Sequence, residues 1–402
     1  MVIAEEELTT SRPAVSRTRA RLIAVAALLL AAVNLRLAVT SVGPVLSEVR
    51  SGLGMSSSVA GLLTSIPAFC FAILGLAAPR LARRFGPARV IIVGLAVLAV
   101  GLALRAYVPG TALFLLLSVV ALAGIAVVNV LLPMIVKEHF PTQVGTMTGL
   151  YTVALNLGAT LAAAATVPLT DSFGGDWRLG LACWAVLAVI ALPAWIPLAR
   201  NDHTVKTQTQ AHDLVRVSRH PVAWALAVYF GLQSTSAYVI IGWLPQIYRD
   251  AGLSADEAGL LFAATSLLGV PLGMALSALA GKMRSQSWIA GTLAVFGMAG
   301  YAGLWWDPAA APWAWAVLLG IVNTAFPLVL TMIGLRGSSP ATVVRLSAFA
   351  QGVGYLLAIP GPILVGVLHD HTNGWRVPLA LMIVLMIPQG IAGMAAGRDR
   401  QI

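Results

Sequence analysis

Twelve apolar runs, each about as long as a membrane helix, dominate this sequence of 402 residues. A transmembrane helix needs about 20 predominantly apolar residues, because the hydrocarbon core of a bilayer is about 30 Å thick. Only 10% of the residues are charged, whereas soluble domains carry about 25%, and the mean hydropathy is +0.88. The sequence therefore predicts an all-α integral membrane protein with twelve transmembrane helices.

The predicted spans form two groups of six, separated by a polar segment. The first group covers 22–46, 58–78, 88–107, 112–136, 144–168 and 178–199. The second covers 221–244, 258–281, 288–306, 313–334, 345–368 and 377–396. We therefore expect a tail at 1–21, an N-terminal six-helix bundle at 22–199, a linker at 200–220, a C-terminal six-helix bundle at 221–396 and a tail at 397–402.

The basic residues predict the orientation of these spans, because Lys and Arg concentrate in the cytoplasmic segments of membrane proteins. If the N-terminus is cytoplasmic, 19 of the 25 Lys and Arg residues lie inside. The external loops then hold only Arg50, Arg105, Arg178, Arg249 and Arg376. We predict a multi-pass protein of a bacterial-type cytoplasmic membrane with both termini, and hence both tails and the linker, in the cytoplasm. The net charge of +10 is then orientation information and gives no reason to expect a nucleic-acid partner.

The two groups of spans resemble each other in sequence. GMSSSVAGLL from Gly54 matches GLSADEAGLL from Gly252, at an offset of 198 residues, and GDWR from Gly175 matches NGWR from Asn373 at the same offset. NVLLP and NTAFP, which both begin with asparagine and end with proline, match at a similar offset of 194. Two six-helix halves repeated in parallel are typical of secondary transporters, which bind substrate between the halves near the bilayer midplane.

Other classes of membrane protein leave no signal in this sequence. It contains neither a Walker A motif nor a zinc-protease motif, and the spans hold no set of catalytic residues, so we expect no enzyme, no metal and no cofactor. Cys70 and Cys183 lie in apolar runs and are expected to be buried thiols. The adjacent His369, Asp370 and His371 are expected in a solvated external loop, and Trp243 in the aromatic belt at the membrane surface.

Arg36 is the most informative single residue, because it lies near the middle of the first span. An arginine there costs about 2.5–3.5 kcal/mol on insertion scales, so it should face a cavity or a partner. We expect it to face the substrate, with Thr40 one turn along on the same side of the helix. The alternative is a structural role, in which Arg36 donates to carbonyls freed near Gly43 and Pro44 or to the amide of Asn129.

Polar side chains at four-residue spacing mark one face of the fifth and eleventh spans. The fifth carries Thr148, Thr152, Asn156 and Thr160, and the eleventh carries Ser347, Gln351 and Tyr355. The hydroxyls could equally bond to their own helix. The candidate substrate-binding residues beyond Arg36 and Thr40 are Asn129, Asn156, Gln233, Tyr238, Asn323, Gln351 and Tyr355. Asn129 and Asn323 each precede a proline by four residues and could equally serve a helix break.

The parallel six-plus-six plan resembles the major facilitator superfamily. NLRLAVTSVGP, LARRFG, NVLLP, GLQSTSAY and LSAFAQGVGYLLAIPGPILVGVLHDHTNGW are similar to its branch of cyanate and nitroimidazole transporters. The resemblance implies a central cavity lined chiefly by spans one, four, seven and ten, and transport by rocking of the halves. One departure is the loop after span two, where Pro79 and Arg83 replace a glycine and an aspartate of the usual pattern, so the charge latch of that loop cannot be carried over.

These observations predict a secondary active transporter, expected to be a monomer, that moves a small monovalent anion or weak acid such as cyanate. Arg36 would bind the anion, since a planar guanidinium can hold it with two parallel hydrogen bonds. An alternative is a carrier of neutral planar heterocycles such as nitroimidazoles, with Arg36 as a hydrogen-bond donor. A more remote alternative is an anion channel.

Overall fold

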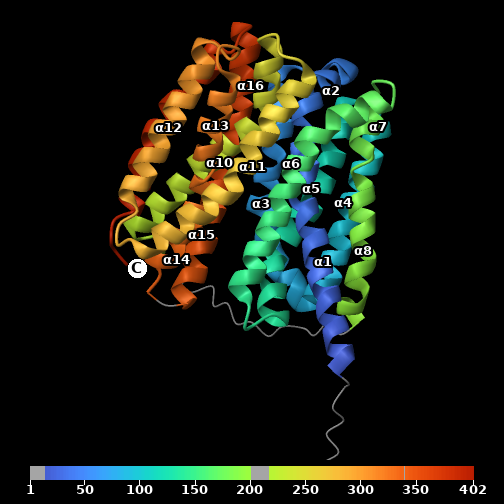
Figure 1. Ribbon diagram of the computed structural model, residues 1–402, viewed down its shortest axis with the longest axis vertical. Helices are drawn as coiled ribbons and strands as arrows, with labels where there is room; N and C mark the ends of the chain where they lie inside the picture. Colours follow the sequence, from blue (N-terminus) through green and yellow to red (C-terminus); the bar gives the residue numbers. More distant parts are fainter. Residues whose placement is uncertain (1–13, 201–216, 339) are drawn as a thin grey trace, which may run out of the picture.

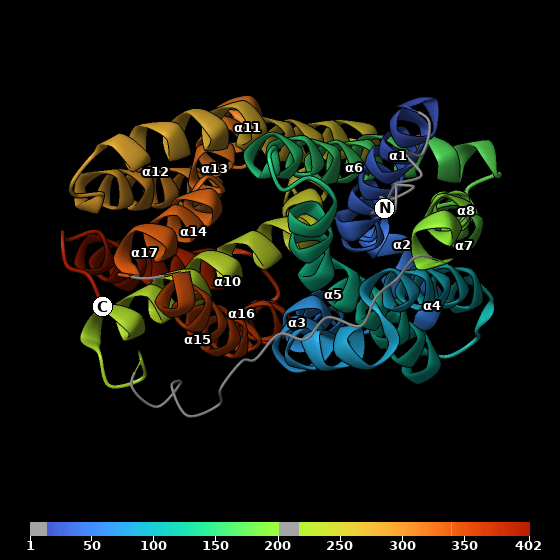
Figure 2. The same cartoon turned by 90° about the horizontal axis from the view of Figure 1, so that it is seen from below.

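The computed structural model describes residues 14–200, 217–338 and 340–402. Twelve segments in these ranges are long and apolar enough to cross a membrane, which confirms the predicted number. Most of the expected tail at 1–21 and linker at 200–220 lies outside the described residues. Figures 1 and 2 show the spans gathered into two helical bundles, which we call the N-half and the C-half.

Helices account for every span of the described chain. The N-half comprises α1 (Ala14–Thr40), η1 (Gly43–Val45), α2 (Leu46–Leu53), α3 (Ser57–Phe85), α4 (Pro87–Tyr107), α5 (Thr111–His139), α6 (Val144–Ser172), α7 (Trp177–Ala182) and α8 (Ala185–Arg200). The C-half comprises α10 (Pro221–Asp250), α11 (Ala255–Lys282), α12 (Ser287–Trp306), α13 (Pro312–Val322), α14 (Ala325–Arg336), α15 (Pro340–Ala358), α16 (Pro360–Thr372) and α17 (Arg376–Ala396).

Four spans are built from more than one helix: the first, sixth, tenth and eleventh. Pro44 interrupts the first span in η1, and Pro360 begins α16 in the eleventh. Proline has no backbone N–H and its ring clashes with the preceding turn, so a helix readily breaks where it occurs. The break at Gly43–Val45 is buried, so other helices cover its irregular backbone, whereas Pro360 at the break in the eleventh span is exposed.

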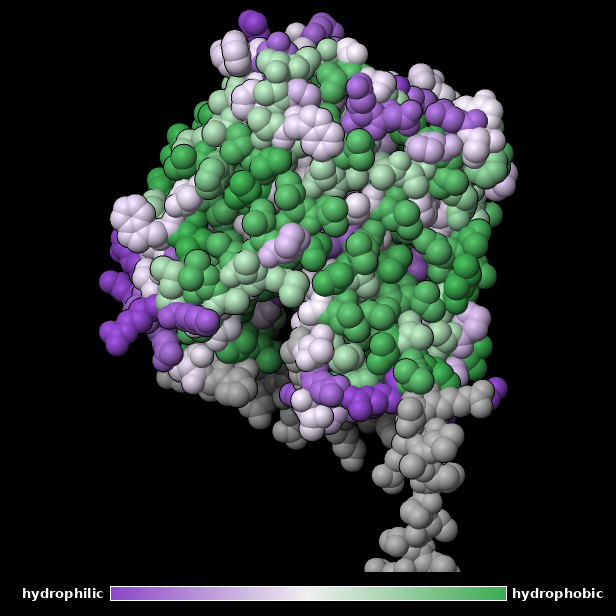
Figure 3. All heavy atoms as spheres, in the orientation of Figure 1, coloured by the Kyte–Doolittle hydropathy of each residue, from purple (hydrophilic) through white to green (hydrophobic). Residues whose placement is uncertain are grey.

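Close helix packing within the N-half depends on small residues. Gly94 of α4 and Gly124 of α5 face each other, and a side chain on Gly124 would run into the carbonyl of Gly94. Glycines at such crossings allow the backbones of membrane helices to approach closely. The opposite face of α4 exposes Val93, Val100 and Leu104, as a surface in contact with lipid should. On the face of the molecule seen in Figure 3, apolar residues cover the middle and polar residues gather toward the two ends.

The two halves meet mainly toward one end of the molecule. We call this the α2 end, at the top of Figure 1, and we call the opposite end, where α1 begins and the chain ends, the terminal end. Across the seam α3 packs along α15 and α16, α6 packs along α11, and α10 packs against η1. At the terminal end the surface is hollowed between the halves (Figure 3). The fold therefore places the middle of the first span, with Arg36, between a closed end and an open one.

Candidate central binding site

Arg36 projects from α1 toward the C-half. Its guanidinium carbon Cζ lies 5.7 Å from the centroid of the Phe326 ring on α14. The side chain is partly accessible, and its guanidinium makes no hydrogen bond or ion pair to any residue that the structure describes. The alternative structural role, in which Arg36 donates to carbonyls near Gly43 and Pro44 or to Asn129, is therefore not supported by any contact among the described residues. Arg36 presents a free charge at the seam between the halves.

Two tyrosines of the C-half lie close enough to Arg36 to interact with its charge: Tyr238 on α10 and Tyr355 on α15. Each is only 9% exposed. Both were predicted site residues, and the fold brings them to the arginine from helices that are separate in sequence. Phenol hydroxyls next to a guanidinium can donate a hydrogen bond to an anion held there.

An aromatic cluster, which sequence reasoning missed, continues from Arg36 across the C-half. It consists of Phe326, Phe230, Tyr355 and Phe71. The Phe326 and Phe230 centroids lie 5.9 Å apart, and Phe230 meets Tyr355 edge-to-face at 5.0 Å. Tyr355 in turn stacks on Phe71 of α3, in the N-half, at 5.1 Å with an interplanar angle of 21°. Of this cluster, sequence reasoning had named Tyr355 as a site residue, and Phe326 lies three residues after the candidate Asn323.

The other polar candidates satisfy much of their hydrogen bonding locally. The Thr40 hydroxyl donates to the Arg36 carbonyl at 3.0 Å, and the Asn156 amide donates to the Thr152 carbonyl at 2.9 Å. The Gln351 amide donates to the Ser347 hydroxyl at 2.7 Å, and Gln233 accepts from its neighbour Ser234 at 3.4 Å. These groups thus bond within their own helices, and each amide keeps further hydrogen-bonding capacity.

The paired asparagines differ in their surroundings. Asn323 ends α13 at the break in the tenth span, whereas Asn129 lies inside the continuous helix α5. The suggested role in a helix break therefore fits Asn323 and fails for Asn129. Both are partly buried, and neither side-chain amide bonds to a residue of the described ranges. They are available as donors or acceptors on spans four and ten.

The fold and this site can now be compared with known proteins. The family profile described as Major Facilitator Superfamily matches residues 28–359. The chain belongs to the major facilitator superfamily. Its solved structural neighbours include a bacterial homologue of the human lysosomal transporter Spinster, with a TM-score of 0.80 at 16% identity, covering 97% of this chain and 100% of that one.

Several curated relatives share this superfamily plan over most of their length. An uncharacterized transporter of Bacillus subtilis is 38% identical over 92% of both chains. The 2-nitroimidazole transporter of Escherichia coli is 35% identical over 95% of this chain and 97% of that one. The cyanate transport protein of Escherichia coli is 33% identical over 90% of this chain and 94% of that one. The chain is thus a membrane transporter of the major facilitator superfamily.

Major facilitator transporters work by moving two halves against each other, and an ion pair joins the halves here at the α2 end. Arg249 of α10 donates to both carboxylate oxygens of Glu48 on α2, at 2.6 and 2.8 Å. The same guanidinium donates to the carbonyl of Pro44 at 3.2 Å. Sequence reasoning placed both charges outside the membrane and did not pair them. Two-pronged contacts of this kind fix orientation as well as adding energy.

A second cross-half contact corrects the prediction of a solvated loop at 369–371. Asp370 lies in the last turn of α16 and accepts from the backbone N–H of Ser57 at 2.9 Å and of Ser58 at 2.6 Å, and from the Ser58 hydroxyl at 2.7 Å. His369 Nδ1 lies 3.0 Å from the Ser57 hydroxyl. The Asp370 carboxylate therefore caps the first turn of α3, where the exposed N–H groups and the helix dipole favour a negative charge.

Trp243 and Arg105 also lie elsewhere than the sequence predicted. Trp243 is fully buried, not in a surface belt, and packs edge-to-face on Trp375 with centroids 5.5 Å apart. Arg105 was expected in an external loop, but it lies in α4 and is only 1% exposed. Both errors arise because the position of a residue in the chain predicts its depth in the membrane. It does not predict whether other helices cover the side of the helix on which the residue lies.

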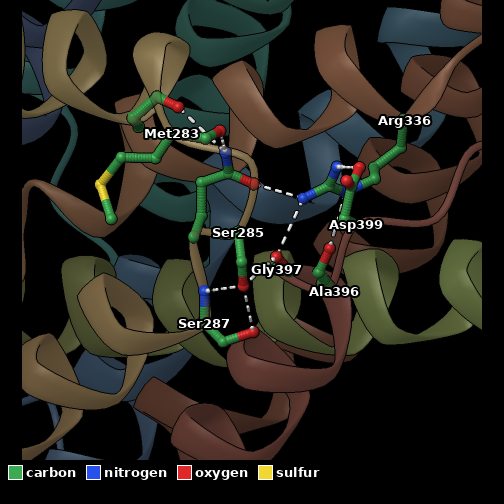
Figure 4. A network of polar contacts seen from close by, with 9 residues as sticks. Met283, Ser285, Ser287, Arg336, Ala396, Gly397 and Asp399 are labelled. Carbon is green, nitrogen blue, oxygen red and sulfur yellow. Dashed lines mark hydrogen bonds and ion pairs between the residues drawn. The ribbon is translucent and has the colours of Figure 1, made fainter.

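At the terminal end, a buried arginine ties together segments of the C-half (Figure 4). Arg336 at the end of α14 donates to the carbonyls of Ala396 at 3.1 Å and Gly397 at 2.9 Å, and to the side-chain oxygen of Gln286. Its Nη1 also lies 3.9 Å from a carboxylate oxygen of Asp399. This network closes the C-half around the junctions of α11 with α12 and of α17 with the C-terminus.

Proposed function

We propose that this transporter carries a small monovalent anion, or a weak acid that can become one, with Arg36 as the charge that binds it. The observation that supports this proposal is the guanidinium of Arg36, which lies between the two halves and forms no hydrogen bond or ion pair with any described residue. A charge held near mid-membrane is costly, and an anionic substrate would offset that cost when it binds. A single cation without a carboxylate partner matches a single negative charge.

The neighbours of Arg36 suit a small anion such as the linear cyanate ion. The guanidinium can donate two parallel N–H bonds, and the hydroxyls of Tyr238 and Tyr355 can add further donors. Asn129 and Asn323 hold unused amides on spans four and ten. Of the remaining candidates, Thr40, Asn156, Gln233 and Gln351 would exchange a local hydrogen bond for one to the substrate. The relative named as a cyanate transport protein is consistent with this chemistry.

A second candidate function is transport of neutral planar heterocycles, and the aromatic cluster favours it. The ring of Phe326 lies beside Arg36, and Phe230 and Tyr355 continue this aromatic surface, which could stack on a flat ligand. Arg36 would then act as a hydrogen-bond donor and not as a counter-charge. The relative named as a 2-nitroimidazole transporter belongs with this alternative.

We further propose that the α2 end faces the outside and that both termini are cytoplasmic. The distribution of basic residues supports this orientation. The structure is then closed to the outside by the Glu48–Arg249 and Asp370–Ser58 contacts and open to the cytoplasm. Alternation to the outward-open state requires these contacts to break and the terminal end to close.

Counterflow in proteoliposomes tests the substrate class. Vesicles loaded with unlabelled cyanate or unlabelled 2-nitroimidazole receive the labelled compound outside, at an imposed potential of zero. The proposal predicts transient, saturable accumulation of labelled cyanate that other small monovalent anions inhibit. Saturable counterflow of neutral 2-nitroimidazole that anions leave unchanged would favour the second candidate. Non-saturating cyanate flux without counterflow would indicate a channel.

The membrane potential provides an independent check on the charge of the substrate. An inside-negative potential opposes entry of one negative charge by about 2.3 kcal/mol per 100 mV. Net uptake of an unaccompanied anion should therefore fall at an inside-negative potential, while uptake of the neutral acid or one-for-one exchange should not. Measuring uptake against imposed potential at two pH values separates these modes.

A further inference from the structure

Arg105 is a second arginine without a partner inside the bundle. It lies on α4, two residues before the helix ends at the α2 end, and is 1% exposed. Its Nε and Nη2 atoms are buried without a hydrogen bond, and its guanidinium has no ion pair within the described chain. Its charge contacts only the face of Phe114, with Cζ 5.8 Å from the ring centroid.

Two other arginines toward the same end, Arg178 and Arg249, have hydrogen-bond partners. Arg178 donates to the carbonyls of Ala106 and Val108 at 2.8 and 2.7 Å. Arg249 is bound to Glu48. Buried polar groups in proteins are almost always hydrogen-bonded, and a buried unpaired charge is among the most costly exceptions. An arginine kept in this state therefore calls for a role that supplies a partner during part of the transport cycle.

Arg105 lines a small cavity on the path between Arg36 and the α2 end. Residues of α1, α3, α5 and α10, and of the break after α1, complete its wall, among them Val39, Gly43, Thr64, Ser118, Ile241 and Gly242. Val39 lies three residues beyond Arg36 and Gly43 seven, which corresponds to rises of about 5 and 10 Å along a helix. The cavity thus begins about one helical turn from the central charge, on the side of the closed seam.

One wall of this cavity is formed by α10 of the C-half, which packs closely against residues of the N-half. A side chain on Gly43 would run into the carbonyl of Ile241, and one on Gly242 would run into the side chain of Thr64. The cavity is therefore closed only while the two halves touch at the α2 end. When the halves separate there, α10 withdraws and the guanidinium of Arg105 faces the opening.

We propose that Arg105 forms a second anion site, which is exposed in the outward-open state and passes the anion to and from Arg36. This inference rests on the proposed function, since it assumes an anionic substrate and the stated orientation. The Arg105 guanidinium would be the first fixed charge that an external anion meets in the pathway. Binding there offsets the cost of the unpaired charge in the outward-open state, and transfer to Arg36 covers about one to two helical turns.

Cysteine labelling tests the site without knowledge of the substrate. Ser118→Cys is placed in a Cys70→Ala/Cys183→Ala background, and Thr64→Cys provides a second position on the cavity wall. Membrane-impermeant thiosulfonate reagents of similar size, one anionic and one uncharged, are added outside sealed vesicles. We expect the ratio of anionic to uncharged labelling rates to fall at least fivefold in Arg105→Gln. Arg178→Gln is the matched control and should change the ratio less than twofold, because that guanidinium is bound to carbonyls.

Transport kinetics provide the second readout. Arg105→Gln should raise the KM for external cyanate at least fivefold and leave the KM for internal cyanate within twofold, whereas loss of the central site impairs both. If Arg105→Gln does not fold, Arg105→Met keeps the apolar contacts with Phe114 and tests the same loss of charge. If Arg105 has only a structural role, replacing it changes neither the labelling ratio nor the ratio of the two KM values.

The outcomes separate this inference from the proposed function. An unchanged labelling ratio in Arg105→Gln overturns the second site, as does a cavity cysteine that stays unlabelled from outside while counterflow continues. Absence of anion counterflow in the unmodified protein overturns the proposed function. If the labelling ratio still depends on Arg105 in that case, the second anion site stands and only the identity of the cargo changes.

Discussion

The guanidinium of Arg36 lies over the ring of Phe326, with Cζ 5.7 Å from the ring centroid, and the two residues come from opposite halves of the transporter. The ring face gives the charge a weak partner that an anion can supplement without displacing it. Because Arg36 and Phe326 belong to different halves, the proposed movement of the halves would change this contact.

Replacing Phe326 by leucine should weaken substrate binding while keeping most of the packing. A cation–π contact contributes about 0.5–2 kcal/mol, so we expect the KM for cyanate counterflow to rise about 2- to 30-fold. Phe296→Leu on α12 is the control, because that ring lies on the molecular surface at 36% exposure. An unchanged KM in Phe326→Leu would mean that the ring does not support the charge during binding.

The Glu48–Arg249 ion pair should bias the transporter toward the conformation closed at the α2 end. Exposed pairs contribute about 0.2–1 kcal/mol, and this pair is partly exposed, at 32% and 21% of the two side chains. Glu48→Gln should therefore shift the conformational equilibrium up to about fivefold toward opening at that end. The shift is measured by pulsed electron–electron double resonance between spin labels on cysteines that replace the exposed Ser51 and Asp256.

The charge swap Glu48→Arg/Arg249→Glu is the control for this prediction. It restores an ion pair with reversed direction and should return the distance distribution most of the way toward that of the parent protein. A distribution that is the same in the parent protein, Glu48→Gln and the swap would show that the pair does not contribute to closure.

Loss of the Asp370 carboxylate should open the same seam more strongly. The carboxylate caps α3 with three hydrogen bonds, and capping and dipole contributions are about 0.5–2 kcal/mol. We expect Asp370→Asn to produce a larger shift in the Ser51–Asp256 distance distribution than Glu48→Gln. Asp171→Asn at the exposed end of α6 should produce no shift, and an equal effect in both variants would contradict a specific cap.

Arg336 should act on stability and not on substrate recognition. Arg336→Gln leaves the carbonyls of Ala396 and Gly397 and the Gln286 side chain without their buried donor, at a cost of about 1–3 kcal/mol for each orphaned group. The midpoint of thermal unfolding in detergent should drop by several degrees, with the KM for cyanate unchanged. The exposed Arg398 provides the control Arg398→Gln, and equal midpoints in the two variants would refute the brace.

The sequence predicted the architecture because hydrophobic length is a local property. Each span is encoded by its own run of apolar residues, so the twelve segments and their two groups could be recognised without knowledge of the packing. The weak internal repeat then indicated how the groups are related. The breaks at Pro44 and Pro360 were also marked by local chemistry, although where the broken ends pack was not.

The arrangement of the seam could not be predicted from the same information. The bonds from Asp370 to Ser57 and Ser58 join residues more than 300 positions apart, and the sequence around each shows only a polar segment. Burial of Trp243 depends in the same way on which helix covers it. To predict that Phe326 lies beside Arg36, one would need to know the depth in the membrane and the facing direction of two helices from different halves.

The candidate site was predicted in part for a physical reason. A mid-span arginine is so costly that it marks a candidate functional position without any tertiary information, and the structure places Arg36 at the seam between the halves. Arg105 escaped the same argument because it lies near a helix end, where an arginine can ordinarily reach the membrane surface. Only the packing of α10 against η1, and of the other cavity walls, shows that this side chain is enclosed.

The central claim is that the charge of Arg36 binds the transported anion, and cyanate counterflow in proteoliposomes with Arg36 variants tests it most directly. We predict that Arg36→Ala abolishes saturable counterflow and that Arg36→Lys retains only a small part of it, because an ammonium keeps the charge but loses the planar fork. Equal amounts of folded protein are confirmed by the thermal unfolding midpoint of each variant. Undiminished cyanate counterflow by a folded Arg36→Ala protein would contradict the claim and leave Arg36 without a role in substrate binding.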